Sequence, residues 1–231
     1  MTRLVIQVEG QTEETFVNRV LASHLLNFGY TSVRATFIGS PRTRGGICAW
    51  PRARRGLIAE LKSDPHVVVT TMVDYYGLPS IDQNGWPGRQ AAAKLSPALR
   101  GASVEKAVLA DLQSELGSDY NLRRFVPFVV MHEFEGLLFS DCVQLCNSIK
   151  RPKLIPKFQK IRDAFGSPEE INDSPQTAPS KRVLHLVPEY TKPFFGVIAV
   201  IDIGLDTIRR ECPHFHDWLE RLESLPAQIQ E

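Results

Sequence analysis

Short apolar runs that alternate with helical patterns constrain the fold of this chain more than any other feature. The runs are residues 4–8, 33–38, 67–73 and 125–131. They are rich in β-branched residues, which is typical of strands buried on both faces of a parallel sheet. The stretches between them repeat apolar residues at helical spacing. We therefore predict an α/β fold with a mainly parallel central sheet and helices on both faces.

The chain has 231 residues, which is enough for one large α/β domain or for one domain with an appendage. We predict a single compact unit in which residues 1–150 form the core and residues 151–231 form a helical extension that packs on it. The expected helices are residues 12–28, 52–61, 104–116 and 153–165, with two short helices between 202 and 225 that Pro213 separates. Ser103 and Ser180 are expected to be N-caps.

Charge and hydropathy limit where the protein acts. The formal net charge is +1, so affinity for nucleic acid would have to come from local clusters of basic residues. No apolar run approaches the roughly 18 residues of a membrane span, and the N-terminus lacks the pattern of a signal peptide. We expect a cytoplasmic protein without membrane attachment. Cys212, His214 and His216 are interpreted as the start of a helix and not as zinc ligands.

Acidic residues follow three of the expected strands. Glu9 ends the first run, Asp74 ends the third, and Glu133 and Glu135 follow the fourth. Parallel strands share their carboxyl edge, so these acids are expected to converge there. Glu13 lies in the first turn of the next helix and can reach back towards Glu9. Because clustered carboxylates repel one another unless a cation lies between them, the pattern predicts a divalent metal site.

A structural interpretation is open for Glu13 and Glu14. Both acids would favour the positive end of the helix dipole, with Thr12 as N-cap. Glu9 has no such explanation, because an acid at a strand end beside Gly10 gains nothing from a cap.

A basic segment follows the second expected strand. Its arginines surround a Gly-Gly pair and Trp50, with no acidic residue among them, and they are Arg42, Arg44, Arg52, Arg54 and Arg55. Guanidinium groups donate to phosphate oxygens in a rigid fork, and a tryptophan can stack on a base. The segment is therefore a candidate nucleic-acid-binding surface, although a solvated loop before a helix would show the same pattern.

Four motifs, in order, resemble those of a known group of bacterial domains. They are Val8-Glu9-Gly10-Gln11-Thr12-Glu13, Met72-Val73-Asp74-Tyr75-Tyr76-Gly77-Leu78-Pro79, His132-Glu133-Phe134-Glu135 and Ala178-Pro179-Ser180-Lys181-Arg182. The group is an uncharacterised domain family that is placed with the Toprim (topoisomerase–primase) fold and is often encoded beside an ATPase gene in anti-phage contexts. The resemblance covers almost the whole chain. It implies kinship with the overcoming-lysogenization-defect nucleases, which cut DNA with Mg²⁺ or Mn²⁺.

The resemblance also implies roles for single residues. Glu9 matches the Toprim glutamate, Glu13 matches an additional acid of those nucleases, and Asp74 matches the first acid of the Toprim Asp-x-Asp motif. Lys181 resembles a late basic residue near the scissile phosphate, while an ordinary exposed lysine is the alternative. These positions imply a catalytic site with Mg²⁺ or Mn²⁺.

Tyr76 stands where the Toprim motif has its second acid. Either Glu133 or Glu135 takes its place, or the protein binds nucleic acid without cutting it. The first interpretation is a metal-dependent nuclease, acting on DNA, with a partner ATPase. The second is a catalytically silent adaptor or sensor that binds nucleic acid and an ATPase, and the third is a phosphohydrolase of small nucleotides. Whether copies of the chain form a homo-oligomer is left open.

Overall fold

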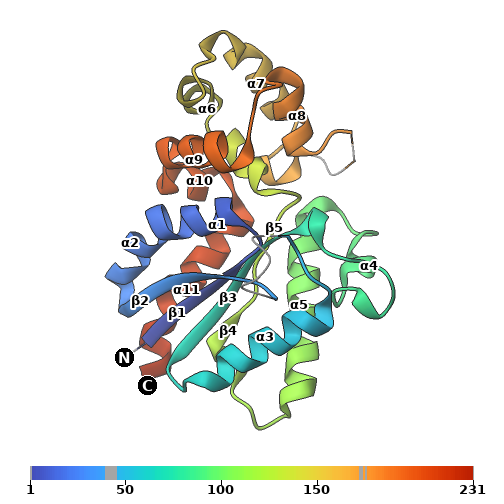
Figure 1. The fold of residues 1–231 in the computed structure, drawn as a ribbon, viewed down its shortest axis with the longest axis vertical. Coiled ribbons are helices and arrows are strands. Elements are labelled where there is room, and N and C mark those ends of the chain that lie inside the picture. The colour runs from blue at the N-terminus through green and yellow to red at the C-terminus, as the bar shows by residue number, and fades with distance from the viewer. Residues whose placement is uncertain (1, 40–45, 172–173, 175, 231) are drawn as a thin grey trace.

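A parallel β-sheet forms the centre of the computed structural model, which describes residues 2–39, 46–171, 174 and 176–230 (Figure 1). Its strands are β1 (Thr2–Val8), β2 (Tyr30–Phe37), β3 (Val67–Asp74), β4 (Phe125–Val126) and β5 (Val129–Val130). The strand order is β2-β1-β3-β4, and β5 also pairs with β3. All of these pairings are parallel. The predicted α/β fold with a mainly parallel sheet is therefore confirmed.

The central strands β1 and β3 are buried on both faces, while the edge strand β2 is mostly exposed or half-buried. Successive side chains of a strand point to opposite sides of the sheet. In β1, Leu4 and Ile6 enter one hydrophobic cluster and Val5 enters the other. The first face is covered by α1 (Gln11–Phe16), α2 (Ala22–Leu25) and α11 (Pro213–Gln230). The second is covered by α3 (Trp50–Ser63) and α5 (Pro97–Leu116). Helices on both faces were expected from runs that are apolar throughout.

The helix after β1 runs from Gln11 to Phe28, but its geometry changes along the way. A π-helical turn, η1 (Val17–Leu21), joins α1 to α2, and a 3-10 turn, η2 (Leu26–Phe28), follows. The helix ends at Gly29, whose φ of 96° is in the left-handed region that glycine adopts without strain. Gly10 is the N-cap, so the sequence-based choice of Thr12 is wrong.

The strand expected at residues 125–131 is interrupted. β4 and β5 are separated by Pro127, which has no N–H for a ladder. At this break the Thr71 hydroxyl takes the place of backbone pairing, since it donates to the Phe128 carbonyl and accepts from the Phe128 N–H, each at 2.9 Å. The prediction of one continuous strand was therefore wrong.

Two expected N-caps are also wrong, because proline sets the start of both helices. Pro97 occupies the first position of α5 after Ser96, so Ser103 lies inside the helix. Pro179 does the same in α8 (Pro179–Leu186), and Ala178 is its N-cap.

The remaining helices form a group at the carboxyl end of the sheet (Figure 1). They are α6 (Cys142–Ser148), α7 (Ile155–Arg162), α8, α9 (Val197–Ile203) and α10 (Leu205–Glu211). The short helix α4 (Arg89–Ala92) lies apart from them, beside α5. Single helical turns complete the described structure: η3 (Tyr75–Gly77), η4 (Asp82–Asn84), η5 (Leu122–Arg124), η6 (Phe134–Ser140), η7 (Pro152–Leu154), η8 (Pro168–Glu170) and the π-helical η9 (Lys192–Gly196).

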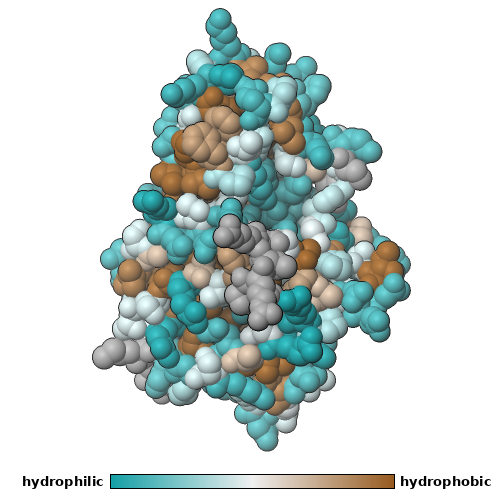
Figure 2. All heavy atoms as spheres, viewed as in Figure 1, coloured by the Kyte–Doolittle hydropathy of each residue, from teal (hydrophilic) through white to brown (hydrophobic). Residues whose placement is uncertain are grey.

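The surface is hydrophilic over most of the face shown in Figure 2, and hydrophobic residues gather over α9 and beside α4. Ile201 in α9 and Leu95 after α4 are among the exposed large apolar side chains. None of the helices in the described ranges is both long and apolar enough to cross a bilayer.

A buried polar network fastens the start of α11 to the rest of the fold. Glu169 accepts hydrogen bonds from the N–H groups of His214 and Phe215, at 2.9 and 3.0 Å. His214 Nε2 lies 2.8 Å from Glu105 Oε1, which also accepts from the Val129 N–H. His214 and His216 lie in the first turn of α11, so the helix start expected at this point is confirmed. Burial alone would lower the pKa of His214, but the hydrogen bond to Glu105 and the nearby acids outweigh it and raise the pKa.

This network predicts a pH-dependent stability. The folded pKa of His214 is raised, so protonated His214 stabilises the fold. This contribution to the free energy of unfolding is fully present below the unfolded pKa of about 6.5 and is lost as pH rises through the folded pKa. We expect His214→Gln to lower the free energy of unfolding by about 1.5–3 kcal/mol at pH 5.5, and by less at pH 9. Urea denaturation across this range measures the difference. The control His185→Gln changes an exposed histidine of α8, and a deficit independent of pH would contradict the assignment.

Candidate functional site

The carboxyl edge of the sheet brings together acids from distant parts of the sequence. Val8 pairs with Met72, so Glu9 and Asp74 leave neighbouring strands at nearly the same level. Asp74 in turn pairs with Val130, which places residues 132–135 at the same edge. The Asp74 N–H donates to Glu9 Oε2 at 3.2 Å, and the Phe134 N–H donates to Asp74 Oδ1 at 2.9 Å. The predicted convergence of strand ends is therefore found.

The ammonium of Lys192 lies at the centre of these acids. Lys192 Nζ is 3.2 Å from Asp74 Oδ2, 3.2 Å from Glu135 Oε2 and 3.4 Å from Glu13 Oε1. Lys192 is the first residue of η9, which joins the group of helices above the sheet. We call Glu9, Glu13, Asp74, Glu135 and Lys192 the acid cluster. It combines one cation with four carboxylates, which come from the residue after β1 and from α1, β3 and η6.

Burial makes the carboxylates of the acid cluster costly to ionise. It is the largest cause that raises the pKa of Glu9, of Glu135 and, most strongly, of Asp74, while the Lys192 charge opposes the shift. For Lys192, burial acts to lower the pKa, but the summed charges of the four carboxylates raise it well above its ordinary value. The lysine is therefore held charged, and the cluster favours an additional proton or cation.

Several features of the acid cluster suit a metal ion. Glu13 Oε1 and Glu135 Oε2 are buried without a hydrogen-bond partner among the described residues, although each faces the Lys192 ammonium. Space for carboxylates is kept by two glycines: a Cβ on Gly10 would lie 3.1 Å from Glu13 Oε2, and one on Gly77 would lie 3.3 Å from both Glu9 carboxylate oxygens. Oxygen ligands of this kind fit Mg²⁺ or Mn²⁺.

A cavity of about 220 Å³ opens beside the acid cluster and is lined by Glu9, Glu13 and Lys192. In the described part of the chain, no three acidic, histidine or cysteine side chains are already arranged around a common metal position. Lys192 stands between the carboxylates instead. The donor set therefore fits a metal ion in its chemistry, and Lys192 would have to give up some of its contacts to admit one.

Two residues predicted for the site lie outside the acid cluster. Glu133 Oε2 accepts from the Ser180 N–H at 2.9 Å and so caps α8, which leaves Glu135 as the fourth carboxylate. Lys181 is exposed on α8 and lines a different hollow, together with Gln176 and His185. Tyr76, in the place of the second Toprim acid, is half-buried, and its N–H donates to the His132 carbonyl at 2.9 Å.

The arginines predicted to bind nucleic acid have separate environments. Arg42 and Arg44 lie outside the described residues. Arg54 pairs with Asp111 at 3.4 Å and with Glu115 at 3.2 Å. Arg52 Nε donates to the Gly39 carbonyl, and Arg55 is exposed on α3.

Trp50 corrects another expectation. Its indole is buried, donates to Asp111 Oδ2 at 2.9 Å and packs on Trp86, with ring centroids 5.0 Å apart. Trp50 is therefore a core residue and cannot stack on a base in this conformation.

Sequence reasoning missed Lys192 and its neighbour Tyr190. The Tyr190 hydroxyl is buried without a partner among the described residues, and a Cβ on Gly196 would lie 2.7 Å from it. Burial is the main cause that raises the pKa of Tyr190, and the charge of Glu135 adds to it. Neither residue lies at a strand end or in a recognisable motif, so no sequence pattern singles them out.

Comparisons with known proteins give one match. A family model described as a domain of unknown function (DUF4276) matches residues 8–223, a span that contains every residue of the acid cluster. No curated protein and no solved structure matches the chain significantly.

The acid cluster predicts a stability effect that depends on pH. Lys192→Met would leave four carboxylates without their cation, and we expect a loss of about 2–3 kcal/mol at pH 8. This is less than for a fully buried pair, because the Lys192 side chain is 35% exposed. Without the lysine, the folded pKa values of the acids rise further, so the deficit should shrink at pH 5, where the acids bind protons.

Urea denaturation of wild type and Lys192→Met at both pH values measures the effect. Lys181→Met is the matched control, and its exposed side chain should leave stability within about 0.5 kcal/mol. A Lys192→Met deficit equal at pH 5 and pH 8 would show that packing, and not charge, is the role of this lysine.

Proposed function

This chain belongs to the DUF4276 family, and we propose that it is a Toprim-like, metal-dependent phosphodiesterase that cleaves DNA. The observation that supports this proposal most is the group of four carboxylates at the carboxyl edge of the parallel sheet, of which three lie within 3.4 Å of the Lys192 ammonium and the fourth, Glu9, accepts from the Asp74 N–H. This edge is where α/β proteins of the open-sheet type bind ligands.

In the proposed site, Glu9, Glu13, Asp74 and Glu135 hold Mg²⁺ or Mn²⁺. Such an ion, when bound, supplies positive charge to the phosphate and activates the attacking water. The protein contributes fixed geometry, since the Phe134 N–H orients Asp74 and the Asp74 N–H orients Glu9. These bonds hold the carboxylates before a ligand arrives, which lowers the cost of reorganisation.

Lys192 takes the role that the sequence resemblance suggested for Lys181. Its side chain is partly exposed beside the 220 Å³ cavity, so the ammonium can turn from the acids towards a phosphate oxygen. There it neutralises the charge that develops as the phosphodiester bond breaks. Glu135 replaces the second acid of the Toprim motif, whose position is occupied by Tyr76.

The wider setting of the proposal comes from the sequence resemblance. On that basis we propose a role in bacterial anti-phage defence with a partner ATPase, and the hydropathy of the sequence favours a cytoplasmic location. Among the described arginines of the basic segment, Arg55 on α3 is the candidate for a phosphate contact, because it is exposed while Arg54 is held by acids and Arg52 donates to the Gly39 carbonyl.

The second candidate function is a catalytically silent adaptor that binds nucleic acid and an ATPase. It is favoured by Lys192, which already neutralises part of the acid cluster without a metal. The two functions predict different responses of the protein to a divalent metal ion. A nuclease is stabilised by metal and cuts DNA, whereas an adaptor is indifferent to metal.

The nuclease proposal predicts both cleavage and metal-linked stability. We expect wild type to nick supercoiled plasmid with Mg²⁺ or Mn²⁺, alone or with the ATPase encoded beside it, and Asp74→Asn and Glu135→Gln to be slower by roughly 100-fold. Metal at 100 times its Kd should stabilise wild type by about 2.7 kcal/mol, measured by calorimetry, and should not stabilise Asp74→Asn.

Glu13→Gln and Glu14→Gln form a matched pair in the first turn of α1. Only Glu13 belongs to the acid cluster, so only its replacement should weaken the response to metal. Equal responses in the two variants would remove Glu13 from the site. A wild type that neither cuts DNA nor responds to metal would favour the adaptor.

Binding to DNA predicts a difference between neighbouring arginines of α3. Arg55→Gln should reduce the slope of log affinity against log salt by roughly 0.9, the value for one phosphate contact. Arg54→Gln should leave the slope unchanged, because Asp111 and Glu115 hold that guanidinium. Fluorescence anisotropy with a labelled duplex at several salt concentrations measures both slopes. Identical slopes for wild type and Arg55→Gln would exclude Arg55 from the interface.

A further inference from the structure

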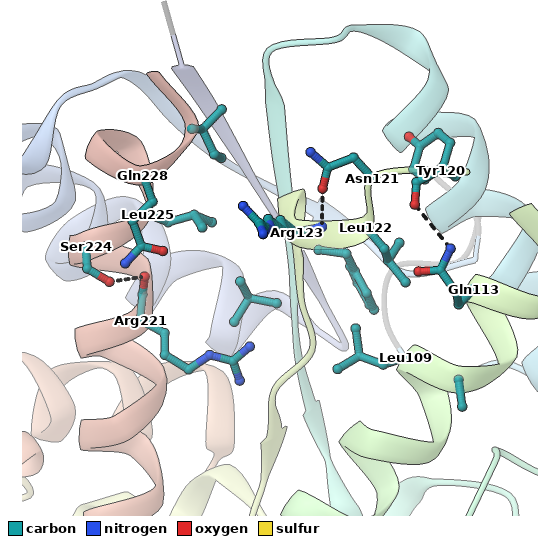
Figure 3. Close-up of a pocket in the computed structure, with 14 residues that line it drawn as sticks. Leu109, Gln113, Tyr120, Asn121, Leu122, Arg123, Arg221, Ser224, Leu225 and Gln228 are labelled. Atoms are coloured by element: carbon teal, nitrogen blue, oxygen red, sulfur yellow. Dashed lines mark hydrogen bonds between the residues drawn. The ribbon is translucent and has the colours of Figure 1, made fainter. Parts of the chain in front are cut away.

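A further cavity, of about 770 Å³, lies beside residues 120–126 (Figure 3). These residues lead into the start of β4, whereas the acid cluster lies at the carboxyl ends of the strands. Three segments enclose the cavity: the second half of α5, residues 120–126 and the last turns of α11. Its size is in the range of small-molecule pockets in proteins. None of the elements that line it contributes to the acid cluster, so a ligand here would serve a separate purpose.

The cavity follows from the short edge strand of the sheet. β4 has two residues and pairs only with β3, so one side of it faces no strand in the described structure. α5 covers one face of the sheet and α11 covers the other, and the two helices leave a gap where they pass this edge (Figure 3). Apolar side chains line the gap, among them Leu109, Leu122 and Leu225.

Two arginines give this apolar cavity a positive charge. The Arg123 and Arg221 side chains point into it from opposite walls (Figure 3). Both are exposed, and neither side chain has an ion pair or hydrogen bond within the described residues. Among the described residues that line the cavity there is no aspartate or glutamate.

The neighbouring Arg124, in contrast, has a structural role. Its guanidinium donates to the carbonyls of Asp64 and Val67 at 3.0 and 2.9 Å. The side chains of Arg123 and Arg221 make no such hydrogen bonds among the described residues, so their guanidinium N–H groups are available to a ligand.

We propose that this cavity binds a small anion that carries an apolar body. Arg123 and Arg221 would grip the anionic group from two sides, because guanidinium donors match carboxylate and phosphate oxygens. The apolar body would lie against Leu109, Leu122 and Leu225. Two sources have an anionic group on a body that can pack against these side chains: fatty-acyl carboxylates, through a hydrocarbon chain, and nucleoside monophosphates, through the flat face of the base. The proposal is independent of the nuclease function, since it involves no residue of the acid cluster.

A pair of fluorescent probes separates the two parts of the recognition. The probes are 8-anilinonaphthalene-1-sulfonate, which is anionic, and N-phenyl-1-naphthylamine, which has the same aromatic body without the charge. We expect Arg123→Gln/Arg221→Gln to bind the anionic probe at least tenfold more weakly than wild type and the neutral probe equally well. Arg19→Gln, which removes one exposed arginine of η1 outside the cavity, is the control and should bind both probes as wild type does.

A cavity-filling variant tests the location. Ala110 lies on the exposed side of α5 and lines the cavity. Ala110→Trp should therefore weaken the binding of both probes without disturbing the core. Thermal unfolding of each variant shows that it is folded. Anionic-probe affinity that is unchanged in both the double-arginine variant and Ala110→Trp would overturn the proposal.

Competition identifies the source of the anion. Displacement of the anionic probe from wild type by decanoate indicates an acyl ligand, and displacement by adenosine monophosphate indicates a nucleotide. Failure of both to displace it would contradict the proposal.

Discussion

Carboxylates that are withdrawn from water require a positive charge, and at the carboxyl edge of this sheet Lys192 supplies it. Three carboxylates lie within 3.4 Å of its ammonium, and the charge of Glu9 acts on it as well. Burial raises the pKa values of Glu9, Asp74 and Glu135, and the charge of Lys192 does not fully offset this shift. One cation cannot balance four acids. The imbalance makes this edge a place that attracts a proton or a metal ion.

The surrounding structure holds these acids in place with backbone groups. The N–H groups of Asp74 and Phe134 fix Glu9 and Asp74, and the glycines at positions 10 and 77 leave space for the carboxylates. Glu133 and Glu135 are two residues apart and have different tasks, because one caps α8 and the other faces Lys192. The helices at the carboxyl end of the sheet are therefore tied to the same short segment that supplies the fourth acid.

The fold could be predicted from the sequence where local patterns and tertiary packing agree. The runs at residues 4–8 and 67–73 became β1 and β3, because both lie at the centre of the sheet, where two apolar faces are needed. The prediction was wrong at residues 125–131, where Pro127 interrupts the backbone hydrogen bonds between the strands. The Thr71 hydroxyl bonds the backbone of Phe128 there instead. Trp50 was misread because no local pattern shows that Asp111 and Trp86 would bury its indole.

The sequence by itself determined that acids would meet at one edge, because strands that are apolar throughout belong to a parallel sheet, and parallel strands end on the same side. Glu9, Asp74 and one of the two glutamates after residue 132 followed from that rule. Only the tertiary structure showed that Glu135 faces Lys192 while Glu133 caps α8, and that Lys192, and not Lys181, lies among the acids. Lys192 lies 118 residues beyond Asp74 in the chain. Contacts over such separations depend on how the helices pack above the sheet, and no local spacing of residue types encodes that packing.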